Sequence, residues 1–356
     1  MLENLAYCPT LHTRSAEMNA LARLPAETKD KIFPLIVAGP RPNAKYLERT
    51  WEKIGDSLGN RRFALDLDPT KKGSDSGKPA AAEFDALFDS KGGFKNYYEA
   101  VAKMAQAIPV LRVGSGQTAQ LKTQADRIDD LDRGVIFRIE FGAPSNSLEF
   151  IDSVLERFED ISIFVDAGWS KDILSRTAWA SGIIERVTKD KPGAELVVSG
   201  SSFPDTFTNV HRRRPVPISE RFLYNELVRQ HNAAKLIYGD WGSTRPPPMD
   251  PTPMRNVPRI DLPKPGEWIV FRRDDEMEKD EDYQDIAKRV IIDPDWPKDL
   301  SIWGTNSINW TAKGQPGGIT GPAAAAAARI NIHLHRQAYY GLNDLIADGD
   351  EPFTDE

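Results

Sequence analysis

The chain has 356 residues, of which 40% are hydrophobic and 28% charged, as is usual for a globular protein. Its net charge of −7 argues against binding of duplex DNA, and its single cysteine, Cys8, excludes an internal disulfide and a thiolate metal cluster. We find no apolar run of 18 residues and no leader segment, so we expect a cytoplasmic protein that does not span a membrane.

Eight short apolar runs recur along the chain, and segments with helical periodicity separate them. In chain order the runs cover residues 7–11, 32–39, 63–69, 108–114, 135–142, 161–168, 195–204 and 235–242. Strands that alternate with helices indicate repeated βαβ units and a parallel sheet. Eight such units predict a (β/α)8 TIM-like barrel. The alternative is a doubly wound open sheet, which the lack of a dinucleotide fingerprint after the first run disfavours.

Two regions interrupt this alternation. Residues 70–83 begin as a polar loop after the third strand, on the face that carries the active site of a barrel. Residues 243–266 hold eight prolines, which predict an extended and irregular insertion. The strand-like run 267–274 then lies outside the closed ring. The alanine-rich segment 323–340 predicts the last barrel helix, delayed by the insertion.

We therefore divide the chain into three parts. Residues 1–244 form the eight βα units of the barrel, in which the first and eighth strands pair. Residues 245–320 form a proline-rich insertion after the eighth strand, with an extra strand hairpin. Residues 321–348 supply the final helix.

Most of the apolar runs alternate, with large apolar residues in one phase and polar residues in the other. Side chains of a strand alternate between faces, so the polar phase is predicted to face the barrel interior near its C-terminal mouth. A shift of one residue would bury charges beneath the helices. The predicted interior set is Asp66, Asp68, Arg112, Arg138, Glu140, Asp166, Ser199, Ser201, Tyr238 and Asp240.

A buried charge is costly unless it is paired, so these groups must pair, bind a ligand or lie at the rim. In the functional interpretation, Glu140, Asp166 and Asp66 are the catalytic candidates, because neighbouring carboxylates can divide the roles of acid and base. Arg112 and Arg138 can bind a carboxylate or a phosphate through two parallel hydrogen bonds.

The binding set also includes residues of the last two strands. Ser199, Ser201 and Ser202 offer donors after the seventh strand, where barrels often bind phosphate, and Asp240 joins them from the eighth. Five interior acids against two arginines leave an excess of three negative charges. A divalent cation such as Mg²⁺ would relieve this excess, although the sequence identifies no ligand set.

The structural alternative is an internal plug of ion pairs, Asp66 with Arg112 and Arg138 with Asp166. It fits the charges almost as well as a ligand site does. The basic stretch 211–215 is predicted to be a solvated loop rather than a site for phosphate or RNA, because three successive arginines do not point to one spot. None of the five histidines has the spacing of a zinc site.

Several strings taken in order resemble the bacteriophage-associated beta protein family. They are YCPTLHTRSAEMNAL leading into KDKIFPLI, then VVSGSSFP, ISERFLYNEL and LIYGDWGST. The resemblance covers most of residues 1–275, with Trp241 where the family more usually has tyrosine. It implies a phage or mobile-element setting and adds no catalytic role.

We therefore predict a barrel protein whose charged C-terminal pocket binds or acts on an anionic small molecule, similar to a phosphate or a nucleotide. The alternative is a non-catalytic interaction protein in phage–host conflict, in defence or counter-defence, that contacts a protein partner through the insertion. The fold alone does not decide, because barrels support many functions. An open charged pocket favours the first function, whereas a mouth filled by paired side chains with an exposed apolar patch on the insertion favours the second.

Overall fold

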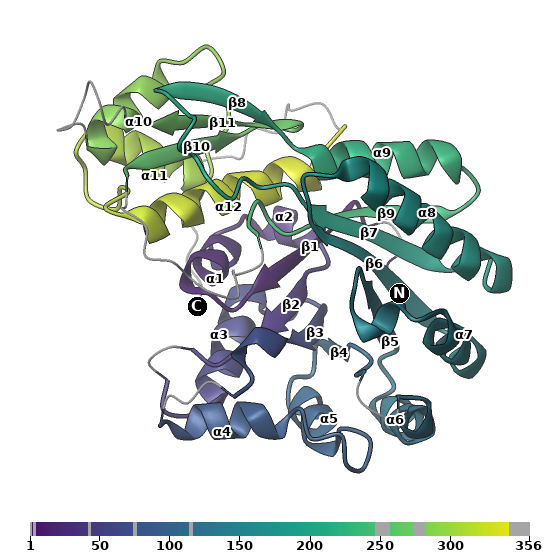
Figure 1. Ribbon diagram of the computed structural model, residues 1–356. Coiled ribbons are helices and arrows are strands. Elements are labelled where there is room, and N and C mark those ends of the chain that lie inside the picture. The colour runs from purple at the N-terminus through teal and green to yellow at the C-terminus, as the bar shows by residue number, and fades with distance from the viewer. Residues whose placement is uncertain are drawn as a thin grey trace.

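The computed structural model describes residues 2, 5–41, 44–73, 77–113, 117–245, 257–273 and 282–341. Its main feature is an eight-stranded parallel sheet in the order β4-β3-β2-β1-β9-β7-β6-β5 (Figure 1). The strands are β1 (Tyr7–His12), β2 (Leu35–Ala38), β3 (Phe63–Leu67), β4 (Ala107–Pro109), β5 (Val135–Glu140), β6 (Ile161–Trp169), β7 (Glu195–Ser201) and β9 (Lys235–Asp240).

The sheet curves into a nearly closed barrel. The first and last barrel strands pair in parallel, with Cys8 opposite Gly239, as predicted. At the remaining junction, a single parallel bridge joins Val110 to Ile136, and the Leu111 N–H donates to the Ile136 carbonyl at 2.8 Å. The prediction of a TIM-like barrel is therefore confirmed at the level of its parallel strands.

Helices cover the outer face of this sheet (Figure 1). They form because apolar residues recur at helical spacing. In α7, Phe150, Ile151, Val154 and Leu155 are buried, while Ser147 caps the first turn by accepting from the Phe150 N–H. The outer helices are α1 (Ser15–Ala22), α2 (Ala26–Asp30), α3 (Glu48–Leu58), α4 (Pro79–Ala86), α5 (Lys95–Ala102), α6 (Gln117–Leu131), α7 (Leu148–Arg157), α8 (Ile173–Asp190) and α9 (Ser219–Gln230).

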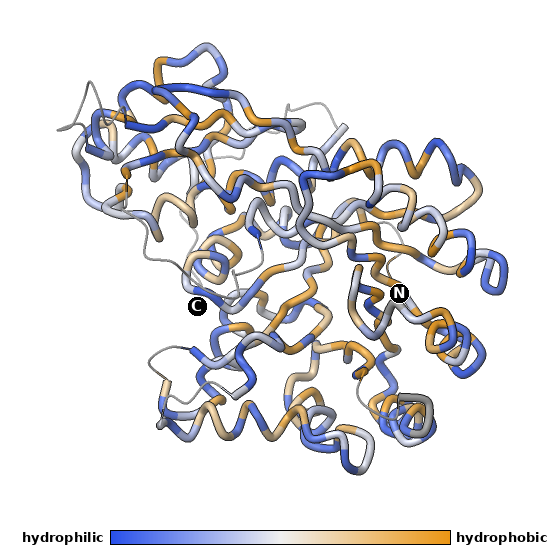
Figure 2. Tube along the Cα trace, viewed as in Figure 1, coloured by the Kyte–Doolittle hydropathy of each residue, from blue (hydrophilic) through white to orange (hydrophobic). Residues whose placement is uncertain are grey.

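The barrel has two apolar layers, one between strands and helices and one inside the ring. Figure 2 shows hydrophobic stretches along the strands and hydrophilic ones on the outer turns of the helices. The inner layer includes Val37, Ala64, Ile136, Phe164 and Val197. Their alternate neighbours, such as Leu65 and Phe137, pack against the helices. The inward and outward faces predicted for the third to seventh strands are therefore confirmed.

A second, smaller sheet lies beside the barrel. It is antiparallel, in the order β10-β11-β8. Its strands are β8 (Arg213–Pro217), β10 (Arg259–Pro263) and β11 (Glu267–Arg272), and it packs with α10 (Tyr283–Ile291) and α11 (Trp303–Ala312). The prediction that β11 lies outside the ring is confirmed.

Two details of this region differ from the sequence predictions. Residues 213–217 form a strand instead of a solvated loop, because β11, some 50 residues later, pairs with them. Residues 257–273 form a regular hairpin, in which Pro258 precedes the edge strand β10, Pro263 ends it and Pro265 lies in the turn. The prolines between positions 246 and 253 lie outside the described residues.

Helix α12 (Pro322–Ala338) lies between the barrel and the second sheet (Figure 1). It packs on α1 and β1 on one side, and on β10 and α11 on the other. Within the part of the chain that the structure describes, no helix combines the length and apolar character needed to cross a membrane.

Candidate functional site

The polar end of the barrel interior is organised around Arg138, which β5 contributes. Its guanidinium donates to Asp66 Oδ2 at 2.9 Å and to Asp166 Oδ2 at 2.6 and 3.1 Å. A further hydrogen bond joins Arg112 to Asp66 Oδ1. Both ion pairs of the structural alternative are therefore present, and Arg138 links them into one network.

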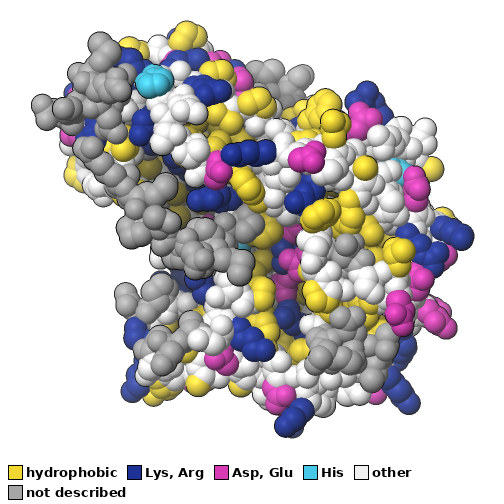
Figure 3. All heavy atoms as spheres, viewed as in Figure 1, with side chains coloured by type: hydrophobic (Ala, Val, Ile, Leu, Met, Phe, Trp, Pro, Cys, Tyr) yellow, Lys and Arg dark blue, Asp and Glu magenta, His cyan; other side chains and the backbone are white. Residues whose placement is uncertain are grey.

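Glu140 lies at the rim of this network. Its Oε1 is 3.1 Å from Arg138 Nη2, and 41% of its side chain is exposed. The structure therefore brings together five predicted residues in one cluster, Asp66, Arg112, Arg138, Glu140 and Asp166. In Figure 3, acidic and basic side chains are visible in a hollow near the middle of the face, over the ring of strands.

The charges within the cluster are strongly coupled. Although burial opposes it, Arg112 and Arg138 hold the pKa of Asp66 below its ordinary value. Burial and the negative charges of Asp66 and Asp166 raise the pKa of Glu140, whereas the positive charges of Arg138 and Arg112 oppose this shift. Glu140 is therefore the cluster carboxyl best placed to exchange a proton.

Asp166 has a second group of partners. Its Oδ1 accepts from the Trp241 indole N–H at 3.1 Å and from the Gly168 amide at 2.9 Å. The guanidinium of Arg138 lies 5.4 Å from the centre of the Trp241 ring. Because both its oxygens are occupied, Asp166 serves to hold Arg138 and Trp241 in place.

Asp240 and Tyr238 lie on the opposite face of the sheet from this cluster, so their predicted place in the interior is wrong. Asp240 is held there by groups on that face. Its carboxylate accepts from the hydroxyls of Tyr7 and Tyr238, the latter at 2.9 Å, and lies 2.7 Å from Nε2 of His333 on α12. Ile237 packs in the inner layer instead. Both phases of this strand carry apolar residues, and the partners that satisfy Asp240 come from distant elements.

The three serines of the seventh strand have different surroundings. Ser199 faces the interior, and its buried Oγ has no hydrogen-bond partner among the described residues. Ser201 donates to the Thr244 carbonyl at 2.5 Å, and Ser202 bonds to the Glu220 carboxyl. Of these three serines, only Ser199 has a hydroxyl without a hydrogen-bond partner among the described residues.

His12 and Asp68 also face the mouth, although His12 was not among the predicted site residues. His12 ends β1 in the same phase as Cys8, which packs in the inner layer. Its Nδ1 lies 3.4 Å from Asp68 Oδ2. The signal that could have identified it was the alternation Cys8, Thr10, His12 in the first strand, with a titratable side chain at the strand's C-terminal end.

Three guanidinium groups belong to segments that follow the C-terminal ends of three different strands. Each keeps a buried nitrogen without a hydrogen-bond partner among the described residues: Nη2 of Arg14, Nε of Arg112 and Nη1 of Arg176. Arg14 follows β1, Arg112 follows β4, and Arg176 lies in the first turn of α8 after β6. Buried donors of this kind are costly unless an acceptor meets them.

Arg112 is the most firmly held of the three. Gln124 of α6 accepts from its backbone N–H and donates to its carbonyl, both at 3.0 Å. The guanidinium lies 5.4 Å from the ring centres of Phe88 and Tyr97, and only 11% of the side chain is exposed. Its position is therefore fixed before any ligand arrives.

Nothing in the described residues forms a metal centre, since no three or more His, Cys, Asp or Glu side chains are placed to hold an ion. Asp66 and Asp166, which the charge count had suggested could attract Mg²⁺, both accept from Arg138. With Asp240 on the other face, four acids and two arginines remain in the interior.

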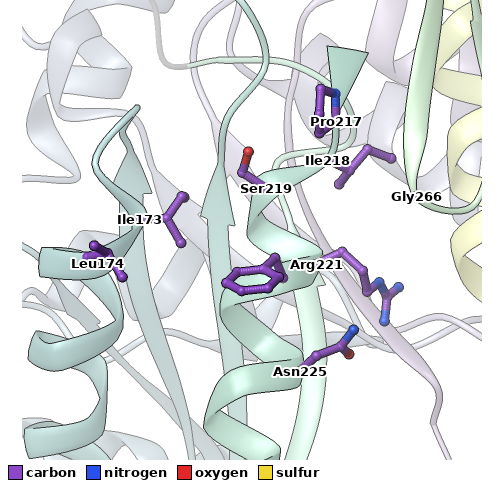
Figure 4. Close-up of a pocket in the computed structure, with 9 residues that line it drawn as sticks. Ile173, Leu174, Pro217, Ile218, Ser219, Arg221, Asn225 and Gly266 are labelled. Atoms are coloured by element: carbon purple, nitrogen blue, oxygen red, sulfur yellow. The ribbon is translucent and has the colours of Figure 1, made fainter. Parts of the chain in front are cut away.

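A separate apolar pocket of about 470 Å³ lies between α8, α9 and the turn at Gly266 (Figure 4). Ile173 and Leu174 line it from the start of α8, and Ile218 and Phe222 from the chain around the start of α9. Leu174 is 80% exposed and Phe222 58% exposed. Most of this apolar surface belongs to the barrel helices rather than to the insertion.

Comparisons with known proteins agree with the resemblance seen in the sequence. The model of a family described as "Beta protein" matches residues 7–339. A relative named "Protein beta", from Enterobacteria phage P4, is 32% identical over 347 residues, which cover 94% of this chain and 93% of the relative.

Proposed function

The chain belongs to the Beta protein family, and from that premise we propose that it binds a small anionic molecule, such as a phosphate or nucleotide-like compound, at the C-terminal mouth of its barrel. One observation carries the proposal. Three guanidinium groups, from segments that follow β1, β4 and β6, each keep a buried N–H without an acceptor among the described residues. An anion with several acceptor oxygens would satisfy such donors together.

The rest of the mouth supports this function in two layers. The lower layer, Asp66, Arg138 and Asp166, is satisfied internally and acts as a rigid floor. The upper layer keeps groups that can reach a ligand, namely Arg112, Glu140 and the hydroxyl of Ser199. Glu140 is the proposed proton donor of any reaction, because its pKa is raised and it borders solvent.

The direct test is calorimetric titration with pyrophosphate, comparing two variants on one helix. Arg176→Met removes a guanidinium that contacts Phe141 at the mouth, whereas Arg186→Met removes one that pairs with Asp152 near the other end of α8. Loss of a charge-assisted hydrogen bond should weaken binding about tenfold in the first variant and leave the second unchanged. Equal affinities in all three proteins, or no binding by the wild-type protein, would refute the proposal.

We further propose that the protein acts in the cytoplasm, without a membrane or duplex DNA as partner, in line with its composition and net charge. We also propose that residues 245–320 are an insertion between the last barrel strand and the last barrel helix.

A second candidate function is that of a non-catalytic interaction protein in phage–host conflict. The observation that favours it is the exposed apolar pair Leu174 and Phe222 beside the pocket of Figure 4. Phe222→Ser should then abolish any effect of the expressed protein on phage plating, whereas Val228→Ser, on the same helix and 39% exposed, should not. Equal effects of both variants would remove this candidate.

A further inference from the structure

His12 and Asp68 form a pair at the mouth that has no role in the proposed binding of an anion. His12 is 4% exposed, and its Nδ1 faces Asp68 Oδ2 at 3.4 Å. The other oxygen of Asp68 accepts from the backbone N–H of Thr70 at 3.0 Å and from its hydroxyl at 2.6 Å. Asp68 is therefore fixed at the end of β3, with one oxygen directed at the imidazole.

The remaining sides of His12 are also defined. Its backbone N–H donates to Glu17 Oε1 at 3.1 Å, and its ring centre lies 5.5 Å from that of Trp241. Nε2 is buried and has no hydrogen-bond partner among the described residues. The imidazole ring is thus held by Asp68 and Trp241, and the backbone of His12 by Glu17, while one ring nitrogen remains available.

Nearby interior atoms share this property. The hydroxyls of Thr10, on the same face of β1, and of Ser199, on β7, are also buried without a described partner. Between these strands lies Gly239 of β9, where an added Cβ would come within 2.9 Å of the Cys8 carbonyl and 3.3 Å of Ser199 Cβ. The absent side chain lets β1 and β7 approach, so these polar atoms line one part of the interior.

The tautomer that a neutral His12 ring adopts follows from its contact with Asp68. Although burial opposes it, hydrogen bonds from His12 and Thr70 lower the pKa of Asp68 to about 2, so this carboxyl is ionised near neutral pH. A carboxylate accepts the proton of Nδ1–H and thereby leaves the lone pair of a neutral imidazole on Nε2.

We propose that His12 is the general base of the mouth, accepting through Nε2 the proton of an O–H group beside the bound anion, with Asp68 as its positioning residue. The inference rests on the proposed function and deepens it. In this step the O–H proton moves to Nε2, the bonding electron pair stays on oxygen, and the resulting imidazolium is stabilised by the Asp68 carboxylate. The ligand class is an anion that carries or orients a hydroxyl or water.

The experiment is ¹⁵N NMR of the five histidine side chains in the full chain, with the His12→Gln variant used to assign His12. His333 is the matched control, because it too faces an aspartate, at 2.7 Å, but through Nε2 and on the helix-facing side, with no exposure. We expect neutral His12 as the Nδ1–H form and neutral His333 as the Nε2–H form. In Asp68→Asn, the His12 preference should fall while that of His333 stays.

Titration with pyrophosphate separates the two claims. Binding that shifts the His12 Nε2 resonance and leaves His333 unchanged supports the inference. Binding at the mouth without any change at His12, or a wild-type His12 in the Nε2–H form, overturns the inference and leaves the proposed function intact. Absence of pyrophosphate binding overturns the proposed function and, with it, the role of His12. The tautomer of His12 in the wild-type protein still tests the inference if Asp68→Asn fails to fold.

Discussion

Two carboxylate clusters lie on opposite faces of the barrel sheet, and they differ in what closes them. The inner one joins Asp66 and Asp166 through Arg138 and opens at Glu140 to solvent. The outer one holds Asp240 beneath α12, where it meets Tyr7, Tyr238 and His333, all of them buried. The same residue types therefore serve structure where a helix covers them, and remain available to a ligand where the barrel opens.

The largest effect is expected when the cation of the inner cluster is removed. Arg138→Met leaves Asp66 and Asp166 buried without their common partner, so the free energy of unfolding should fall by about 3–5 kcal/mol. Urea denaturation at pH 7 measures this. A loss below about 1 kcal/mol would show that the floor of the mouth is not an ion-pair network.

The pH dependence of stability should come from Glu220, next to the outer cluster. Burial, and then the charge of Asp240, raise the pKa of Glu220 to about 8, against the hydrogen bond from Ser202. The folded state therefore favours the neutral acid, so its contribution is complete below about pH 4 and is lost as pH rises through 8. The loss amounts to roughly 3–5 kcal/mol.

Urea denaturation of the wild-type protein and of Glu220→Gln from pH 4 to 9 tests whether stability falls as the pH rises. The curve of the variant should be flatter between pH 5 and 8 because glutamine does not ionise. Two parallel curves would mean that Glu220 is charged in the folded protein.

A smaller effect is expected at the centre of the outer cluster. Asp240→Asn keeps the size of the side chain but loses the charge that His333 and the two tyrosines stabilise, so unfolding should become easier by about 2–3 kcal/mol. Pyrophosphate affinity should not change, because Asp240 faces α12. A change in that affinity at constant fold would connect the two clusters and weaken the contrast between them.

The smallest effect on stability is expected at the rim. Glu140→Gln removes a half-exposed partner of Arg138, so stability should change by less than about 1 kcal/mol. Pyrophosphate should bind at least as tightly, because a negative charge leaves the mouth. A markedly lower melting temperature would identify Glu140 as part of a structural plug instead.

The contrast between the clusters also explains what the sequence could predict. The inward and outward faces of the third strand could be predicted, because Phe63, Leu65 and Leu67 alternate with small or acidic residues. The eighth barrel strand is ambiguous, because Ile237 and Tyr238 are both suited to burial and occupy opposite faces. Which face of this strand turns inward depends on His333 of α12, which contacts Asp240 from 93 residues further along the chain, and no local pattern reveals this contact.

The same reasoning applies to the parts that sequence analysis missed. Strand β8 exists because β11 pairs with it, and its own composition of arginines and prolines carries no strand signal. His12 could not be identified by charge, because formal charge distinguishes acids and arginines but not a single histidine. Its partner Asp68 was correctly expected inside, so the pair became visible only when the structure joined the ends of β1 and β3.

The most direct test of the two-layered mouth is a crystal structure of the protein with pyrophosphate. We predict density for the anion at the C-terminal end of the barrel, within hydrogen-bond distance of Arg112 Nε and Arg176 Nη1, with the contacts of Arg138 to Asp66 and Asp166 unchanged. Density only elsewhere, or an anion that displaces Asp166 from Arg138, would contradict the division into a structural floor and a ligand-binding rim.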